Sequence, residues 1–70
     1  MHYQPVNSSN LRAVAYDPST QLLGIRFKGN TEYHYYGVPQ SIYLGLMNAS
    51  SHGSYHAAYI KDVYQYRRVA

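Results

Sequence analysis

Cationic and aromatic side chains recur together at two places in the chain, a combination typical of nucleic-acid binding. Arg26 and Lys28 alternate along one predicted strand, and Tyr33 and Tyr35 alternate along the next. Tyr rings can stack on unpaired bases, whereas Lys and Arg contact phosphates. Near the end of the chain a Tyr is again followed by two Arg. The candidate nucleic-acid-binding residues are Arg26, Lys28, Tyr33, Tyr35, Tyr66, Arg67 and Arg68.

The loop around Ser51 and Gly53 is a second candidate site. Ser51 precedes a predicted helix, and the N-terminus of a helix attracts anions. The same serine can instead cap the helix by accepting a hydrogen bond from one of its first N–H groups. Capping is the commoner role of such a loop, and both roles predict that Ser51 lies at a helix start.

Residues suited to catalysis or metal binding are scarce. His52 and His56, four residues apart, could supply half of a zinc site, but only two further His and three carboxylates could complete it. No nucleophile motif surrounds the Ser51-His52 pair. The chain has no Cys, which excludes disulfides and thiolate chemistry. We therefore expect no catalytic residue, no metal and no cofactor, and hence a protein that is not an enzyme.

The size and charge of the chain limit the function classes further. Seventy residues allow one small domain, and six Lys or Arg against three Asp or Glu give a net charge of +3, which favours an anionic partner. No apolar run approaches the ~20 residues of a membrane span, and the first residues do not resemble a signal peptide. We expect a cytoplasmic protein without a membrane partner, present as a monomer or a weak homodimer.

The chain alternates strand-like and helix-like patterns in an order that predicts an α+β fold. The expected segments are a flexible N-terminus at 1–5, strands at 11–16, 21–28 and 31–36, a helix opened by Pro39, a second helix after Ser51 or Ser54, and a short extended segment at 64–69. A three-stranded antiparallel β-meander would thus be followed by two short helices packed on one face. Residues 6–69 would form the single domain.

The length of the hairpin loop near Gly29 decides where Tyr33 and Tyr35 point. A two-residue loop at Gly29-Asn30 would place both tyrosines on the face of Arg26, as an exposed platform. A three-residue loop would shift the register by one residue and turn both tyrosines into the core. A small chain needs large apolar groups, which favours the core position.

Short segments spread over nearly the whole chain resemble the KTSC domain, a bacterial and phage module named for its occurrence at the C-terminus of some lysyl-tRNA synthetases. The matching segments are Ser8-Ser9-Asn10, Tyr16-Asp17, Leu23-x-Ile25-x-Phe27, Tyr33-His34-Tyr35, Val38-Pro39, Ala49-Ser50-Ser51-x-Gly53-x-Tyr55, Ile60 and Tyr64-x-Tyr66-Arg67. One departure is His56-Ala57, where the family usually has Phe-Asn.

The resemblance implies an RNA partner through the synthetase link, and it assigns no catalytic activity. Our first hypothesis is therefore a small nucleic-acid-binding module, with RNA as the suspected ligand. The alternative is a module that binds a protein or a nucleotide ligand and acts as an inhibitor or adaptor. Abundant Tyr and few charges are also typical of protein interfaces.

Overall fold

A computed structural model describes all 70 residues. The elements in chain order are β1 (Gln4–Pro5), β2 (Leu11–Asp17), β3 (Leu22–Phe27), β4 (Thr31–Tyr35), α1 (Gln40–Asn48), α2 (His52–Tyr59) and β5 (Tyr66–Arg68).

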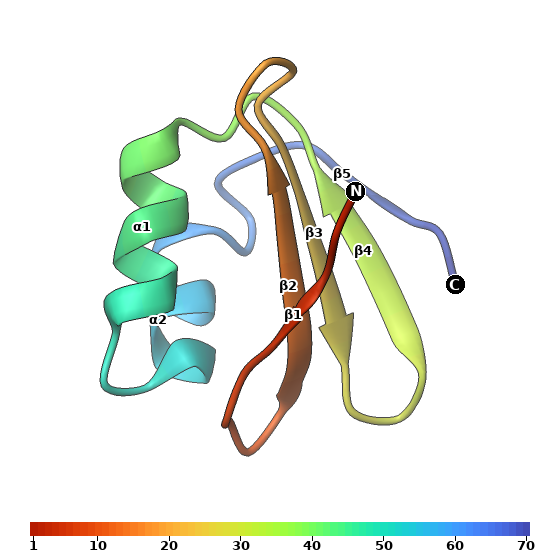
Figure 1. Ribbon diagram of the computed structural model, residues 1–70, viewed down its shortest axis with the longest axis vertical. Coiled ribbons are helices and arrows are strands. Elements are labelled where there is room, and N and C mark those ends of the chain that lie inside the picture. Colours follow the sequence, from red (N-terminus) through yellow and green to blue (C-terminus); the bar gives the residue numbers. More distant parts are fainter.

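The five strands form one sheet in the order β1-β2-β3-β4-β5, and all neighbouring strands are antiparallel. Both helices cover the same face of this sheet, which we call the inner face (Figure 1). The α+β class and the one-sided helical layer are therefore confirmed, but the predicted number of strands is wrong. The two additional strands have two and three residues, too few to show a period of two in the sequence.

The N-terminal segment runs along the outer edge of β2. Gln4 pairs with Val14, and Pro5 pairs with Ala13. An edge strand tolerates proline because its missing N–H interrupts no internal ladder. Residues 1–5, which we expected to be flexible, thus include a strand, and the segment before it crosses the outer face (Figure 1).

The C-terminal segment completes the opposite edge of the sheet. Tyr66 pairs with Tyr35, and Arg68 pairs with Tyr33. The expected extended segment is therefore β5, which returns to β4 after both helices. This return brings the two aromatic-and-basic segments of the sequence side by side.

The β3–β4 hairpin has a three-residue loop. Phe27 pairs with Thr31, so Lys28, Gly29 and Asn30 lie between the strands. Gly29 and Asn30 both have positive φ, 93° and 67°, a conformation that glycine and asparagine tolerate.

This register settles the direction of the tyrosines. Ile25 pairs with Tyr33, and Leu23 pairs with Tyr35, so both tyrosines share the inner face with the core residues of β3. Arg26 pairs with Glu32 on the outer face. The exposed platform of Tyr33 and Tyr35 beside Arg26 is therefore wrong, and the core position is confirmed.

The core lies between the inner face and the helices. Its eight members are Leu11, Val14, Leu23, Ile25, Tyr35, Val38, Leu46 and Ile60. Gly45 of α1 allows close packing of the helices, because the phenol of Tyr55 occupies the space where a Cβ would lie. Neither helix is long and apolar enough to cross a membrane.

Candidate functional site

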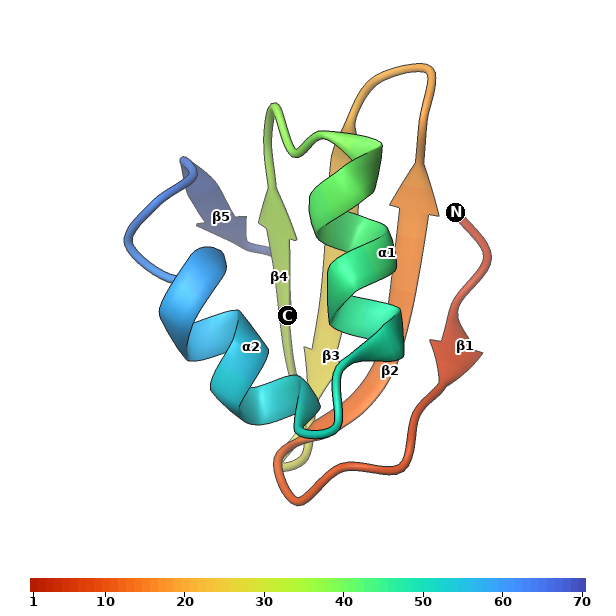
Figure 2. The same cartoon turned by 90° about the vertical axis from the view of Figure 1, so that its left-hand side faces the viewer.

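A groove with a volume of about 470 Å³ opens on the inner side, where α2 faces β4, β5 and the hairpin loop. Figure 2 shows α2 beside β4 and β5, with α1 farther along the sheet over β2 and β3. We call this hollow the inner groove. Its lining residues are Asn10, Phe27, Lys28, Thr31, Tyr33, Tyr35, Gly53, His56, Ala57, Lys61, Asp62 and Tyr66.

Aromatic rings line the groove in a graded order of exposure. Tyr35 is buried, Tyr33 is half-buried, and Tyr66 is 56% exposed. The ring centroid of Tyr66 lies 5.5 Å from that of Tyr33 and 5.9 Å from that of Tyr35. Phe27 meets Tyr33 edge-on at 5.8 Å. Tyr66 is therefore the ring that a ligand can reach, and the others hold it in place.

The floor of the groove contains a polar pair. Oη of Tyr35 lies 2.8 Å from Nε2 of His56, and His56 is only 7% exposed. Burial lowers the pKa of His56, and the charge of Lys61 lowers it further. Burial also raises the pKa of Tyr35 to about 12. Both groups are therefore neutral near pH 7, and their contact is a hydrogen bond rather than an ion pair.

The rim of the groove carries two lysines and one acid. Lys28 lies in the hairpin loop, and Lys61 and Asp62 follow α2. Neither lysine forms a salt bridge; the salt bridges of the molecule are Arg26–Glu32 and His34–Glu32. Both ammonium groups are therefore free to meet an anion.

Arg26 is separated from this groove by the thickness of the sheet. Its Nε donates to Glu32 at 3.0 Å, and its guanidinium lies 3.8 Å from the ring centroid of Tyr3. Tyr3 donates from its hydroxyl to the second oxygen of Glu32 at 2.7 Å. The hydrogen bonds from Tyr3 and Arg26 lower the pKa of Glu32. Arg26 thus belongs to an outer-face cluster and not to the aromatic groove.

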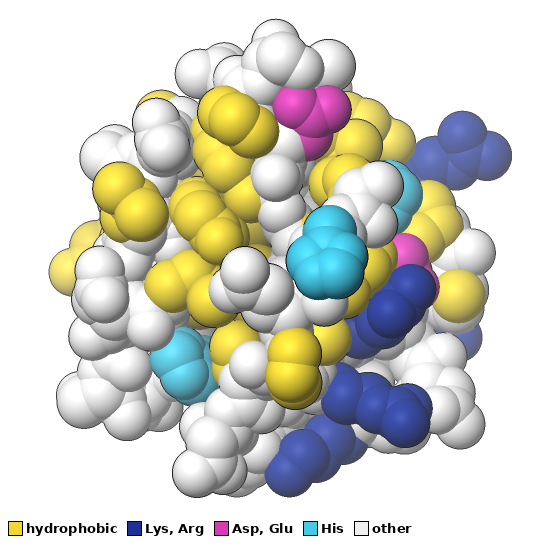
Figure 3. All heavy atoms as spheres, viewed as in Figure 1, with side chains coloured by type: hydrophobic (Ala, Val, Ile, Leu, Met, Phe, Trp, Pro, Cys, Tyr) yellow, Lys and Arg dark blue, Asp and Glu magenta, His cyan; other side chains and the backbone are white.

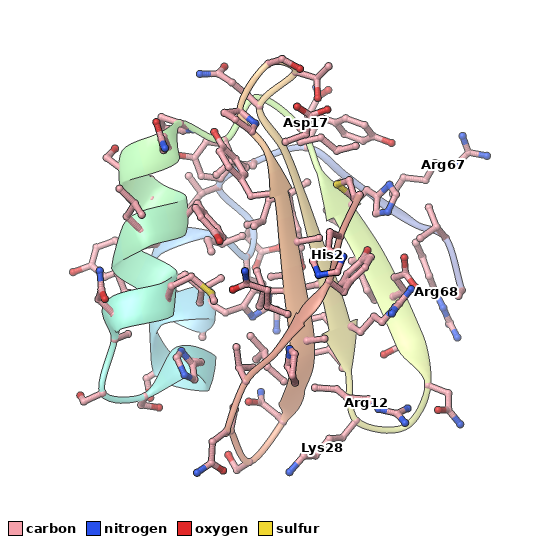
Figure 4. The ribbon with its side chains drawn as sticks, in the orientation of Figure 1. His2, Arg12, Asp17, Lys28, Arg67 and Arg68 are labelled. Carbon is pink, nitrogen blue, oxygen red and sulfur yellow. The ribbon has the colours of Figure 1, made fainter.

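Arg67 and Arg68 lie on the exposed edge strand β5. Arg67 pairs with His34, and Arg68 pairs with Tyr33, but neither arginine lines the groove. Nε of Arg68 donates to the carbonyl oxygen of Ala70 at 2.9 Å. Figure 4 shows both side chains on the side of the sheet away from the helices. Of the seven predicted nucleic-acid-binding residues, the groove brings together Lys28, Tyr33, Tyr35 and Tyr66.

The loop before α2 has the capping geometry. Oγ of Ser51 accepts a hydrogen bond from the backbone N–H of Ser54 at 3.2 Å and donates to Oγ of Ser54 at 3.0 Å. Gly53 lies against the side chain of Asn10, which leaves no room for a Cβ. Ser51 therefore caps α2, and Gly53 forms part of the groove wall.

The two histidines of α2 make separate contacts. Nδ1 of His52 lies 2.8 Å from the carbonyl oxygen of Leu46, whereas His56 bonds to Tyr35. The structure contains no group of three or more potential metal ligands.

Asn10, Thr31 and Lys61 are among the groove residues that were not predicted as binding residues. Asn10 lies in the segment before β2, Thr31 begins β4, and Lys61 follows α2. Each is polar and ordinary in its local context, and only the packing of α2 against the sheet brings it to the groove.

Residues 7–66 match the model of the KTSC domain family, which covers most of the chain. The chain belongs to the KTSC domain family. The crystal structure of a KTSC domain protein from Yersinia pestis superimposes with a TM-score of 0.96 at 33% sequence identity, covering 99% of this chain and 97% of that one. The KTSC resemblance inferred from the sequence is thus confirmed.

Two curated relatives place the KTSC domain in different contexts. A protein from Tsukamurella paurometabola is 40% identical over 67 residues, which is 96% of this chain and 97% of the relative. A lysine–tRNA ligase from a Nostoc species is 34% identical over 62 residues, which is 89% of this chain but only 11% of the ligase. The match therefore covers nearly the whole of the first relative but only a small part of the second.

Proposed function

We propose that this KTSC domain is a non-catalytic module that binds single-stranded RNA, with one base held in the inner groove against Tyr66. The exposure of Tyr66 carries the proposal. Its ring is 56% exposed at the groove, while Tyr33 and Tyr35 lie behind it at centroid distances of 5.5 and 5.9 Å. A ring held in this way loses little conformational freedom when a base stacks on it.

The polar groups of the groove suit the rest of a nucleotide. Lys28 and Lys61 are free of salt bridges and lie at the rim, where they can meet phosphates. Asn10 and Thr31 offer hydrogen-bonding groups that can meet base edges. Because the aromatic and cationic groups share one groove, a single nucleotide can engage both.

The relationship to a synthetase makes RNA the first ligand to test. The Nostoc relative is named as a lysine–tRNA ligase, and the domain corresponds to 11% of that protein. That activity belongs to the whole enzyme, so the relationship supports RNA as a ligand class and no catalytic role.

The volume of the groove also favours a second candidate, a mononucleotide-binding module. About 470 Å³ falls within the range of roughly 300–1,000 Å³ that is typical of small-molecule sites. The two candidates use the same residues, so they differ only in whether phosphates beyond one nucleotide add affinity.

Fluorescence anisotropy with a labelled RNA of about 12 nucleotides tests the proposal at salt concentrations from about 50 to about 200 mM. With about three phosphates contacted, the slope of log affinity against log salt is expected to be about −2 for a single strand. An affinity that does not change with salt, or no binding to RNA or single-stranded DNA at low salt, would overturn the proposal. A mononucleotide that binds as tightly as the oligomer would instead select the second candidate.

Three tyrosine variants locate the site. Tyr66→Ala should weaken binding about 5- to 150-fold, the range expected for a lost stacking contact, whereas Tyr66→Phe keeps the ring and should bind as the wild type does. Tyr59→Ala is the matched control, because Tyr59 is 54% exposed on α2 but does not line the groove. Equal losses of RNA affinity in Tyr66→Ala and Tyr59→Ala would exclude the inner groove as the binding site.

A further inference from the structure

We infer that the bound strand continues from the inner groove across the β3–β4 hairpin loop and that Arg12 contacts its phosphate backbone on the far side. This inference rests on the proposed function, because it extends the same nucleic-acid site. It adds a second contact region and predicts that a polynucleotide, rather than one nucleotide, is the ligand.

A second groove lies on the outer side of the same hairpin, with a volume of about 500 Å³. We call it the outer groove. Its lining residues are Tyr3, Pro5, Arg12, Ala13, Arg26, Phe27, Asn30, Thr31, Glu32 and Ala70. Phe27 and Thr31, the pair that closes the hairpin, line both grooves, so the two hollows lie on opposite sides of the base of the hairpin loop. A strand that leaves the inner groove at this point reaches the outer one by passing around the three-residue loop.

Arg12 is directed to this place by a β-bulge. Leu11 pairs with Phe27, but the next paired residue of β2 is Ala13, which leaves Arg12 without a partner on β3. A bulge turns the direction of the extra side chain. Arg12 is exposed, and its Nη1 donates to Oδ1 of Asn30 in the hairpin loop at 3.2 Å. The bulge thus places a guanidinium group beside the loop that separates the grooves.

The charges along this path fit a polyanion. Lys28 and Arg12 project from the same end of the sheet (Figure 4), and Figure 3 shows Lys and Arg side chains gathered around that end. Neither residue forms a salt bridge. The carboxylate of the outer groove, Glu32, is already engaged by Tyr3 and Arg26. The free positive charge therefore lies on both sides of the hairpin, as a continuous phosphate backbone requires.

Binding of RNA ligands of increasing length by Arg12→Ala tests the inference. For an RNA of about 12 nucleotides at about 50 mM salt we expect a loss of about 5- to 10-fold and a salt slope smaller by about 0.7, as one lost phosphate contact predicts. Binding of a dinucleotide should be unchanged, because it fills only the inner groove. Arg12→Lys keeps the charge and should retain the wild-type slope.

Arg67→Ala is the matched control, because it removes the same charge from an exposed position that lines neither groove. Arg12→Gln repeats the test with a longer neutral side chain, and thermal unfolding of each variant checks the fold. The inference is overturned if Arg12→Ala and Arg12→Gln bind the long RNA as the wild type does, if they lose dinucleotide binding equally, or if Arg67→Ala shows the same loss. A dinucleotide that binds in a Tyr66-dependent way would still support the proposed function in each of these cases.

Discussion

Oη of Tyr35 and Nε2 of His56 lie 2.8 Å apart and join β4 to α2 beneath the inner groove. The two residues are 21 positions apart in the sequence, and both are almost fully buried. Their rings also meet edge-on, with centroids 5.6 Å apart. The floor of the candidate site is therefore held by a polar contact between the sheet and the helical layer.

Replacing Tyr35 by Phe should destabilise the domain by about 1–2 kcal/mol, because His56 loses its buried partner while the ring volume is kept. Urea denaturation at pH 7 measures this change in the free energy of unfolding. Tyr36→Phe is the control, since Tyr36 is 44% exposed, and it should change stability by less than about 0.5 kcal/mol. Equal effects of the two variants would show that the Tyr35–His56 bond contributes nothing.

The lowered pKa of His56 predicts a loss of stability in mild acid. The folded state holds His56 neutral below its ordinary pKa of about 6.5, so the unfolded state takes up the proton first as the pH falls. The free energy of unfolding should therefore fall between about pH 7 and pH 5. In urea denaturation, His56→Gln should reduce this dependence of the unfolding free energy on pH. His2→Gln, which replaces an exposed histidine, should not change it. If His56→Gln lost as much stability in mild acid as the wild type does, His56 would not be the cause of that loss.

Tyr3→Phe should raise the pKa of Glu32 toward its ordinary value, because the hydrogen bond from Tyr3 is the main cause that lowers it. A lowered carboxyl pKa stabilises the fold above about pH 4.3, and this contribution disappears as the carboxyl is protonated. The variant should therefore be less stable than the wild type at pH 7, and the difference should shrink in acid. NMR titration of the Glu32 carboxyl carbon gives the pKa directly.

Asp17 provides an internal reference for that titration. Asp17 lies at the β2–β3 turn, where hydrogen bonds from Ser19 lower its pKa. Its titration should therefore be the same in the wild type and in Tyr3→Phe. An unchanged Glu32 titration in Tyr3→Phe would mean that the N-terminal segment does not hold Tyr3 on the outer face.

Deletion of Asn30 should destabilise the domain. If Phe27 still pairs with Thr31, the loop keeps only Lys28 and Gly29, and the favoured two-residue turns would place Lys28 at positive φ. If the loop keeps three residues, Phe27 pairs with Glu32, and the one-residue shift moves Tyr33 and Tyr35 to the outer face. Circular dichroism and thermal unfolding should show a lower melting temperature. Asn30→Gly keeps the loop length and tolerates the positive φ, so it should fold as the wild type does. A deletion variant with the wild-type melting temperature would show that the domain does not need the three-residue loop.

Patterns within one element predicted most of the fold. The alternation of Leu23, Ile25 and Phe27 predicted β3, and helix α1 follows Pro39 as expected. Ser51 also lies at a helix start. These predictions succeeded because each depends on residues a few positions apart. Strand β1 was not predicted, and β5 was predicted only as an extended segment outside the sheet, because each is too short for a pattern and forms only against an existing edge.

The candidate site was predicted only in part, because its residues come from five separate segments. Tyr66 and Lys28 carried a chemical signal in the sequence, and both line the inner groove. Arg26 carried the same signal but lies on the opposite face, since neighbouring residues of a strand alternate between faces. Lys61 and Asn10 were not predicted as binding residues, yet both line the groove.

The sequence by itself determined the family, the α+β class, the number of tyrosines and the excess of Lys and Arg over Asp and Glu. Tertiary structure decided which of these residues meet. One extra residue in the β3–β4 loop turns Tyr33 and Tyr35 inward, and the return of β5 to β4 leaves Tyr66 as the exposed ring. Side-chain direction in a sheet depends on register, and register depends on loop length and on pairing between distant segments.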